Sequence, residues 1–245
     1  VTIVCKRGSF VHKQLEQQSR IKYIDIDFYS RTFSVSMLIA VRRIIKKYKI
    51  KNVVLIGATE LKTLYFAFLG YELHVIVRHG TTKLTSKKDW LHKLIYSFVD
   101  IHVALSEHLI NNVKKILPLH PEVRFEYIPQ SYRCEYSETQ PGKILDTGKI
   151  KLIHIGRVVE GKGHIDAVKA CEALYKAKID FELQLLGSID DSYFEKLKKI
   201  VDSLPYKEKV TFAGRVSNVS EYLKNSDILL FPSMGEGMPN AVIEA

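Results

Sequence analysis

The sequence predicts an α/β protein built from two units, each with a parallel β-sheet. Short apolar runs typical of buried strands recur along the chain, and stretches with helical periodicity lie between them. This alternation fails between Tyr132 and Lys149, where the polar segment Glu135–Gly142 ends in Pro-Gly, and it resumes afterwards. We therefore expect one domain over residues 1–140 and a second over residues 141–245, joined by a linker.

In the first unit, runs of apolar and β-branched residues are expected to form the strands Thr2–Cys5, Val53–Ile56, Leu73–Val77, Ile101–Leu105 and Phe125–Ile128. Ser34 is the expected N-cap of a helix that carries apolar residues from Leu38 to Tyr48 on one face and basic residues on the other. A second helix is expected over Ser106–Ile116. The basic helix after Ser34 either lies on a membrane surface or covers a sheet, and both alternatives stay open at this point.

The second unit repeats the pattern. Its expected strands are Lys151–Ile155, Phe181–Leu186, Val210–Ala213 and Ile228–Phe231, and its expected helices are Ile165–Lys176, Tyr193–Leu204 and Val219–Lys224. Asp190 and Asp191 are expected to cap the helix that contains Tyr193. Ligands of open parallel sheets bind beyond the carboxyl ends of the strands, so we expect the loops after these four strands to share one site.

Composition narrows the class of protein. The chain has 245 residues, of which 46% are hydrophobic, enough for a large core, and no run reaches about 18 apolar residues, which argues against a membrane-spanning helix. Cys5, Cys134 and Cys171 lie far apart and in no metal-binding pattern, so we expect a reducing, cytoplasmic compartment and no zinc site. The chain starts without Met in an expected strand and stops in an expected helix, so we expect a fragment of a longer protein.

The net charge of +10 comes from the first half. Residues 1–140 carry 22 Lys and Arg against 12 Asp and Glu, whereas residues 141–245 carry 15 of each kind. A basic half attracts nucleic acid, anionic lipid head groups or an acidic substrate. The basic residues are not interleaved with aromatic residues and contain no nucleic-acid-reading motif, so nucleic acid is the weaker alternative. A basic surface that is simply solvated is the remaining one.

The most informative segment is residues 233–245. It follows an apolar strand, passes through a loop with two glycines and a proline, and restarts at Asn240 as a helix. The N-terminus of a helix presents unpaired backbone N–H groups that attract a phosphate. Glu236 and Glu244 bracket this site. Because carboxylates repel phosphates, we expect them to bind sugar or ribose hydroxyls beside the phosphate.

A second glycine loop, Gly156–Gly163, joins the strand Lys151–Ile155 to the helix near Ile165. It carries the cations Arg157 and Lys162, and a guanidinium and an ammonium together can neutralise a pair of phosphates that one helix terminus cannot. Both loops belong to the same expected sheet. Together they favour a diphosphate site.

These two segments resemble the Glu-x7-Glu motif and the Gly-Arg…Lys-Gly diphosphate loop of retaining GT-B glycosyltransferases, family 4 in particular. The resemblance covers most of the chain and is strongest after residue 150. It implies two Rossmann-like domains that face a cleft, and a UDP-, GDP- or ADP-sugar as the donor substrate, with no cofactor and no metal. Two departures are visible: the family's Pro-Asn-Gly is here Pro129-Gln-Ser131, and its first glycine-rich loop lies outside this sequence.

The resemblance also implies residue roles. Arg157 and Lys162 would stabilise the charge that develops on the leaving diphosphate, Glu236 would contact the donor sugar, and Glu244 would contact the ribose. His79, next to a glycine after the strand Leu73–Val77, would position the sugar or the reacting hydroxyl.

The catalytic residues expected from the family are His79, Arg157, Lys162 and Glu236. The further nucleotide-sugar-binding residues are Gly156, Gly187, Arg215, Val216, Gly237, Met238, Pro239, Asn240 and Glu244. Ser188 stands where the family has the second glycine of Gly-x-Gly. By contrast, His74, His102 and His154 lie inside expected strands and are expected to be packing residues.

The implied reaction moves a sugar from a nucleoside diphosphate sugar to a hydroxyl acceptor with retention of configuration. We expect a glycan or lipid-linked acceptor in cell-surface polysaccharide or lipopolysaccharide synthesis. The basic first half suggests an acidic glycan, a lipid-linked phosphate or an enzyme that rests on the cytoplasmic face of an anionic membrane, and these alternatives stay open at this point. A nucleotide-sugar epimerase of GT-B fold is the nearest alternative. A basic nucleic-acid-binding protein and an inactive binding module are the alternatives from other classes.

Overall fold

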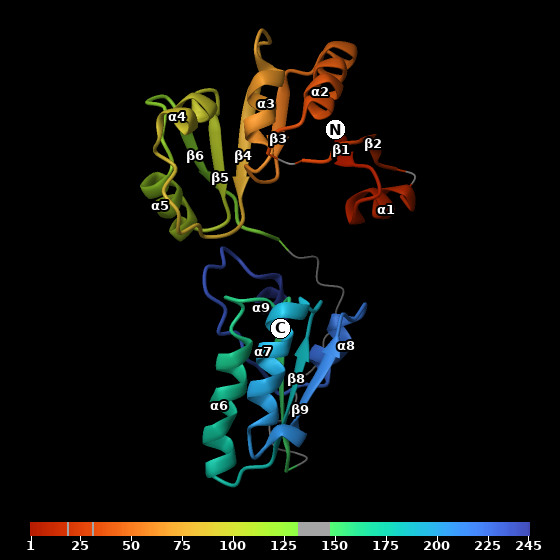
Figure 1. Ribbon diagram of the computed structural model, residues 1–245, viewed down its shortest axis with the longest axis vertical. Coiled ribbons are helices and arrows are strands. Elements are labelled where there is room, and N and C mark those ends of the chain that lie inside the picture. Colours follow the sequence, from red (N-terminus) through yellow and green to blue (C-terminus); the bar gives the residue numbers. More distant parts are fainter. Residues whose placement is uncertain (19, 31, 132–147) are drawn as a thin grey trace. The chain divides into compact units, whose positions relative to one another are not determined.

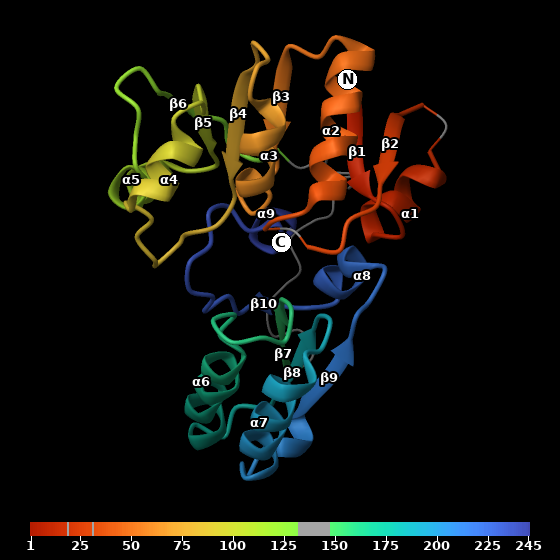
Figure 2. The ribbon, with the colours of Figure 1, turned by 45° about the horizontal axis from the view of Figure 1, so that its top comes forward.

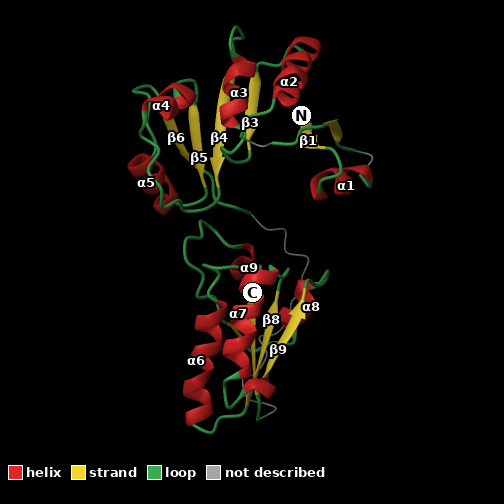
Figure 3. Ribbon diagram, viewed as in Figure 1, coloured by secondary structure: helices red, strands yellow, loops and turns green. Residues whose placement is uncertain are grey.

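The computed structural model describes residues 1–18, 20–30, 32–131 and 148–245, which form two compact units, Val1–Pro129 and Gln130–Ala245 (Figure 1). The expected domain boundary at residues 140/141 lies outside the described residues, as do Cys134 and the expected linker Glu135–Gly142. The α/β class is confirmed. Strands and helices alternate along both units (Figure 3), and every strand pair in the described part of the chain is parallel.

Unit 1 contains a strand pair, β1-β2, and a four-stranded sheet with the order β3-β4-β5-β6. Its strands are β1 (Thr2–Lys6), β2 (Lys22–Ile26), β3 (Asn52–Leu55), β4 (His74–His79), β5 (Ile101–Ala104) and β6 (Arg124–Tyr127). Its helices are α1 (Phe10–Glu16), α2 (Val35–Tyr48), α3 (Leu61–Phe68), α4 (Trp90–Tyr96) and α5 (Glu107–Ile116). All the expected strands are found to within two residues of their expected bounds, and β2 is an additional one.

Helix α2 joins the two sheets of unit 1. Ser34 is its N-cap, as expected, and accepts a hydrogen bond from the backbone N–H of Met37. Met37 packs with Ile26 beside β2, whereas Ile45 belongs to the larger core formed with α3, α4, α5 and β4. The apolar residues of α2 thus pack into both of these cores, as expected for an amphipathic helix that covers a sheet.

One of the basic residues expected on the outer face of α2 has a structural role. The Arg42 guanidinium donates hydrogen bonds to the carbonyls that end helix α3, those of Phe66, Ala67 and Leu69, at 3.4, 3.3 and 2.9 Å. The same guanidinium lies 4.9 Å from the centre of the Tyr71 ring. Arg42 therefore satisfies carbonyls that a helix leaves unpaired at its C-terminus, whereas its neighbour Arg43 is exposed.

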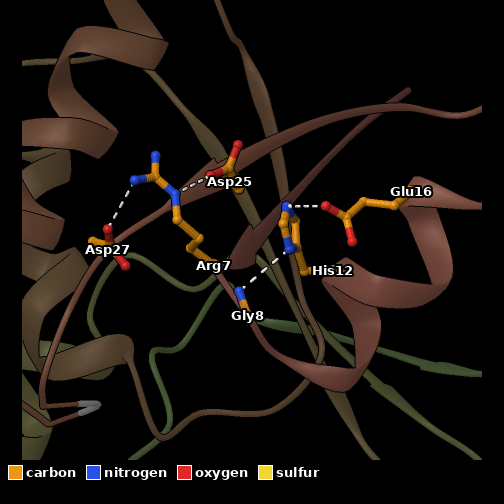
Figure 4. Close-up of polar contacts among 6 residues, drawn as sticks. All are labelled: Arg7, Gly8, His12, Glu16, Asp25 and Asp27. Atoms are coloured by element: carbon orange, nitrogen blue, oxygen red, sulfur yellow. Dashed lines mark hydrogen bonds and ion pairs between the residues drawn. The ribbon is translucent and has the colours of Figure 1, made fainter.

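Charged side chains join the loop after β1 to strand β2 (Figure 4). Arg7 contacts Asp25 through Nε at 2.5 Å and Asp27 through Nη1 at 3.0 Å. His12 on α1 accepts the backbone N–H of Gly8 through Nδ1 at 3.2 Å. The hydrogen bond from Arg7 keeps the pKa of Asp25 below its usual value. Because these side chains are solvent-accessible, they fix the local geometry and contribute little stability.

Unit 2 contains one four-stranded sheet with the order β10-β7-β8-β9. Its strands are β7 (Ile150–Ile155), β8 (Phe181–Leu186), β9 (Val210–Gly214) and β10 (Ile228–Leu229). Its helices are α6 (His164–Lys176), α7 (Asp191–Asp202), α8 (Val219–Lys224) and α9 (Asn240–Glu244), with a short 3-10 helix at Lys207–Lys209. Helices α6 and α7 lie side by side (Figures 1 and 2) and bury their apolar residues in one core with β7, β8 and β9.

Two elements of unit 2 differ by two residues from their expected bounds. Strand β10 ends two residues earlier than expected: Leu230 still donates to the Ile153 carbonyl at 2.8 Å, but Pro232 has no N–H with which to continue the ladder. Helix α7 starts at Asp191, two residues early. Asp190 holds its N-cap position, and its side chain accepts from Ser192 instead of from a backbone N–H.

No helix in the described part of the chain is both long enough and apolar enough to span a membrane. Among the same residues, no group of three or more His, Cys, Asp or Glu side chains is placed to hold a metal ion.

Candidate functional site

The two glycine loops singled out in the sequence lie against each other in unit 2. Strands β7 and β10 are parallel neighbours, so the loops that follow them leave the same edge of the sheet. The backbone N–H of Met234 donates to the carbonyl of Gly161 at 2.9 Å. Gly163 has a φ of +77°, and a Cβ at this position would lie 2.3 Å from the carbonyl oxygen of Pro232. Only glycine permits this backbone approach.

An ion pair between Lys162 and Glu236 connects the two loops. The ammonium of Lys162 forms an ion pair with Oε1 of Glu236, and Ser233 Oγ donates to the same oxygen at 2.9 Å. Burial opposes the ionisation of Glu236, but the hydrogen bonds from Lys162 and Ser233 and the charges of Lys162 and Arg157 outweigh it. The pKa of Glu236 therefore lies below its usual value, and the group is a carboxylate at neutral pH.

The loop after β8 contacts the Gly156–Gly163 loop on the side opposite to the loop after β10. Gly187 has a φ of +152°, and a Cβ there would lie 1.8 Å from the carbonyl oxygen of Gly156. The N–H of Gly187 donates to the carbonyl of Gly214 at the end of β9, at 2.8 Å. Arg215 and Val216 directly follow this bond, Arg215 exposed and Val216 half-buried. The structure thus links the loops after β7, β8, β9 and β10 in one row along the carboxyl edge of the sheet.

Helix α9 begins at Asn240, with Pro239 at its N-cap. Gln130 contacts this start: its side-chain Nε2 donates to Oδ1 of Asn240, and its backbone N–H points to the sulfur of Met238 at 3.2 Å. In the sequence, Gln130 is notable only as a departure from the family's Pro-Asn-Gly. The sequence did not predict its contacts with Met238 and Asn240. Gly237 is half-buried in the loop, and Glu244 is the last, half-buried residue of α9.

A pair of buried histidines lies beneath the Gly156–Gly163 loop. His154 on β7 and His164 on α6 are fully buried, and their rings meet edge to face with centres 4.4 Å apart. His154 donates from Nδ1 to the Leu230 carbonyl at 2.8 Å, but neither nitrogen of His164 has a hydrogen-bond partner among the described residues. Burial, together with the charge of His154, lowers the pKa of His164 to about 4. The pair is neutral at physiological pH.

The buried position of His154 agrees with its expected packing role, and that of His102 on β5 does so too. For His74 the expectation is wrong. His74 is the first residue of β4, where its backbone bonds to Lys51 while its side chain is exposed. The position of a residue inside an apolar run does not reveal which face of the strand it occupies at the end of a sheet. His164, which directly follows the Lys162-Gly163 pair, was missed.

His79 is the last residue of β4 in unit 1, and only 3% of its surface is exposed. Its Nε2 lies 2.9 Å from Nδ1 of His102, which makes one ring the donor and the other the acceptor. Burial, with smaller contributions from His102 and Lys83, lowers the pKa of His79 to about 3. His79 is therefore a neutral, oriented imidazole at the carboxyl end of its strand. Its contact with a donor sugar stays a prediction.

Residues 137–245 match the family model described as Glycosyl transferases group 1. This segment is thus similar to group 1 glycosyltransferase domains. It contains both glycine loops, the Lys162–Glu236 ion pair and the buried histidine pair.

The whole chain is similar to known glycosyltransferases. It is 24% identical to the capsular polysaccharide biosynthesis glycosyltransferase CapH of Staphylococcus aureus, over 98% of this chain and 67% of CapH. Among solved structures, it is similar to HepE of Anabaena in complex with UDP and glucose, with a TM-score of 0.76, 16% identity, and coverage of 99% of this chain and 70% of HepE. The lipopolysaccharide outer core galactosyltransferase WaaB gives a TM-score of 0.63 at 16% identity, over 93% of this chain and 63% of WaaB.

These structural similarities show that the chain has the GT-B type of fold, which confirms the expected fold class. The chain spans about two thirds of the length of CapH, HepE and WaaB. The expected cleft between the units stays a prediction.

Proposed function

We propose that this chain belongs to a glycosyltransferase that moves a sugar from a nucleoside diphosphate sugar to a hydroxyl acceptor, with retention of the anomeric configuration and without a metal ion. The observation that carries the proposal is the contact between the loops after β7 and β10. The family match supports a transferase, and this contact supports a site for a charged donor: it places Lys162, with Arg157 in the same loop, beside the loop that leads to α9.

The charge balance of the site suits a diphosphate. Lys162 now has one carboxylate partner, Glu236, and a diphosphate brings more negative charge than one carboxylate. Gly163 is the N-cap of helix α6, and it has no side chain with which to cap the first N–H groups of the helix. These N–H groups, Arg157 and Lys162 are suited to stabilising the charge that builds up on the departing diphosphate. Preorganised groups of this kind are a large catalytic term, and they need no metal ion.

The carboxylates then have separate roles. Glu236 is ionised and held by Ser233 and Lys162, so it can accept hydrogen bonds from sugar hydroxyls while Lys162 turns to the phosphates. Glu244 at the end of α9 is assigned to the ribose. His79 is assigned to the sugar or the reacting hydroxyl, since a neutral imidazole can donate or accept a proton there without adding charge.

We extend the proposal to the acceptor and the cellular setting. CapH acts in capsular polysaccharide biosynthesis and WaaB in the lipopolysaccharide outer core, as their names state. By analogy, the acceptor is a glycan or a lipid-linked hydroxyl in cell-surface polysaccharide assembly. The excess charge of +10 in residues 1–140 favours an acidic acceptor and a location on the cytoplasmic face of an anionic membrane.

A screen of UDP-, GDP- and ADP-sugars for thermal stabilisation of the full-length protein tests the donor. A specific donor at a hundredfold excess over its dissociation constant should stabilise the protein by about 2.7 kcal/mol. Lys162→Gln should remove most of this effect, whereas Lys169→Gln on the exposed face of α6, which loses the same charge, should leave it unchanged.

The reaction itself is tested by NMR of the product formed with the stabilising donor and a mixture of glycan acceptors. Transfer with the anomeric configuration of the donor supports the proposal. Free nucleoside diphosphate together with an altered sugar, and no glycosylated acceptor, would instead identify an epimerase. If no nucleotide sugar stabilises the protein, the donor site is assigned wrongly.

A further inference from the structure

We infer that unit 1 holds a separate binding site for an organic phosphate, in a pocket of about 520 Å³ between α4 and the segment that follows α5. Lys88 and Lys93 line it from one side and Lys114 from the other. The remaining lining residues are Ser97, Leu117, Pro118, Leu119, His120 and Pro121. This site is independent of the proposed donor site in unit 2.

The pocket lies at the edge of the sheet opposite to His79. Ser97 precedes β5 and Leu117–Pro121 precede β6, so these residues surround the amino ends of the two strands. Lys88 reaches the same edge because the segment after β4 runs along α5: the N–H of Lys83 donates to Asn112 at 3.0 Å and that of Lys87 to the Ile116 carbonyl at 2.8 Å. A ligand here is remote from the carboxyl ends of the strands, where sheets of this type bind their substrates.

The charges in the pocket are of one sign and are not neutralised. Lys88, Lys93 and Lys114 take part in none of the ion pairs found among the described residues, and no acidic side chain lines the pocket. The ammonium of Lys114 lies 4.9 Å from the centre of the Phe125 ring, which holds it at the rim. Like charges gathered in a hollow concentrate the field and attract an anion.

The other lining residues suit a phosphate that carries an organic group. Nδ1 of His120 accepts the backbone N–H of Glu122 at 3.2 Å, which leaves Nε2 as the ring nitrogen that can donate to an anion. Leu117 is 1% exposed and, with the two prolines, forms an apolar floor. The volume exceeds that of a phosphate ion alone, which leaves this floor for the organic part of the ligand.

Helix α4 adds exposed apolar side chains beside the lysines. Trp90, Lys93, Leu94 and Ser97 follow the spacing of one helical face, and Trp90 and Leu94 are 75% and 42% exposed. An exposed tryptophan next to a basic pocket is typical of a surface that meets lipid head groups. The same phosphate chemistry also occurs in soluble phosphate esters, so the test must separate the two sources.

The test measures the binding of two probes to the full-length protein. One is glycerol 3-phosphate, followed by calorimetry, and the other is a phosphatidylcholine vesicle with or without phosphatidylglycerol, followed by co-sedimentation. The pocket variant Lys93→Gln/Lys114→Gln is compared with Lys46→Gln/Lys47→Gln, which removes the same charge from exposed positions on α2. The variant loses two exposed charge contacts with the ligand, so it should bind about two- to thirtyfold more weakly.

The control variant should bind like the wild type. A second variant, Lys88→Gln/Lys93→Gln, keeps the contact of Lys114 with Phe125 and guards against a folding defect. Binding of glycerol 3-phosphate that depends on the pocket lysines identifies a site for soluble phosphate esters. Binding of anionic vesicles alone with the same dependence identifies a head-group site. The inference is overturned if neither probe binds, or if the α2 variant loses as much binding as the pocket variants.

Discussion

Replacing Gly163 by alanine should destabilise unit 2 much more than replacing Gly161, although both glycines lie in the same loop. Both have a positive φ, +77° for Gly163 and +83° for Gly161. A Cβ at residue 161 meets no atom within 4 Å, whereas one at residue 163 lies 2.3 Å from the Pro232 carbonyl oxygen and 2.6 Å from the carbonyl carbon. The pair of variants therefore separates backbone strain from the close approach of the two loops.

The magnitudes follow from these two terms. A left-handed conformation costs a residue with a side chain about 1–2 kcal/mol, and this cost applies to both variants. Overpacking against atoms that cannot move costs about 1–3 kcal/mol more, and it applies to Gly163→Ala alone. We expect Gly161→Ala to lower the free energy of unfolding of unit 2 by about 1–2 kcal/mol and Gly163→Ala to lower it by about 2–5 kcal/mol.

Hydrogen exchange of the buried amides of β8 measures this free energy for unit 2 separately from unit 1. Each 1.4 kcal/mol accelerates exchange about tenfold, so an overpacking cost of about 1–3 kcal/mol should make Gly163→Ala exchange about five- to 150-fold faster than Gly161→Ala. Equal exchange in the two variants would show that the approach of Gly163 to Pro232 is not required, and would remove the main structural support for a joint site.

Two further predictions concern the buried histidine pair and the end of α3. His164 stays neutral down to about pH 4 in the folded state, while the unfolded chain takes up a proton near its usual pKa of 6.5. The unfolded state therefore binds more protons in this range, and stability should fall with decreasing pH by about 1.4 kcal/mol per unit for this group. His164→Phe should flatten that slope in urea unfolding followed by circular dichroism; an unchanged slope would refute the assignment. Arg42→Ala should lower the stability of unit 1 by about 2 kcal/mol, because it removes charged hydrogen bonds to the carbonyls at the end of α3, whereas exposed Arg43→Ala should change it by less than about 0.5 kcal/mol. Similar losses in both arginine variants, in the same unfolding assay, would contradict a special role for Arg42.

The sequence predicts those features that depend on neighbouring residues. Apolar, β-branched runs such as Phe181–Leu186 form the expected strands, and Ser34 and Ser106 cap the expected helices through their hydroxyls. Strand β2 was missed because Lys22–Ile26 alternates apolar residues with Lys and Asp and has no continuous apolar run. A strand that is buried on both faces has a nearly continuous apolar run, which is easily recognised in the sequence. A half-exposed strand at the edge of a sheet has no such run and is easily missed.

Contacts between distant residues could not be predicted in the same way. The two loops were recognised separately, but the ion pair of Lys162 with Glu236 joins residues 74 positions apart, and the contact of Gln130 with Asn240 joins residues 110 apart. The ion pair depends on the order of strands in the sheet, and the contact of Gln130 depends on the position of α9; periodicity encodes neither. The burial of the His164 nitrogens is a similar case, since the neighbouring rings of His154 and Tyr193 come from strand β7 and helix α7.

The position of β10 beside β7 has a consequence for biosynthesis. Ile228 pairs with Leu152, so the ribosome makes all of α6, β8, α7 and β9 before β7 gains this neighbour. Until then, the apolar strand Ile150–Ile155 has an open edge, which is a template for pairing with other chains. The pairing of β10 with β7 also closes a loop of 76 residues, and contacts between neighbouring residues do not offset the entropy lost in this closure. The two loops can meet only after this late step, so a molecule that binds both of them would select copies in which the edge of β7 is already covered.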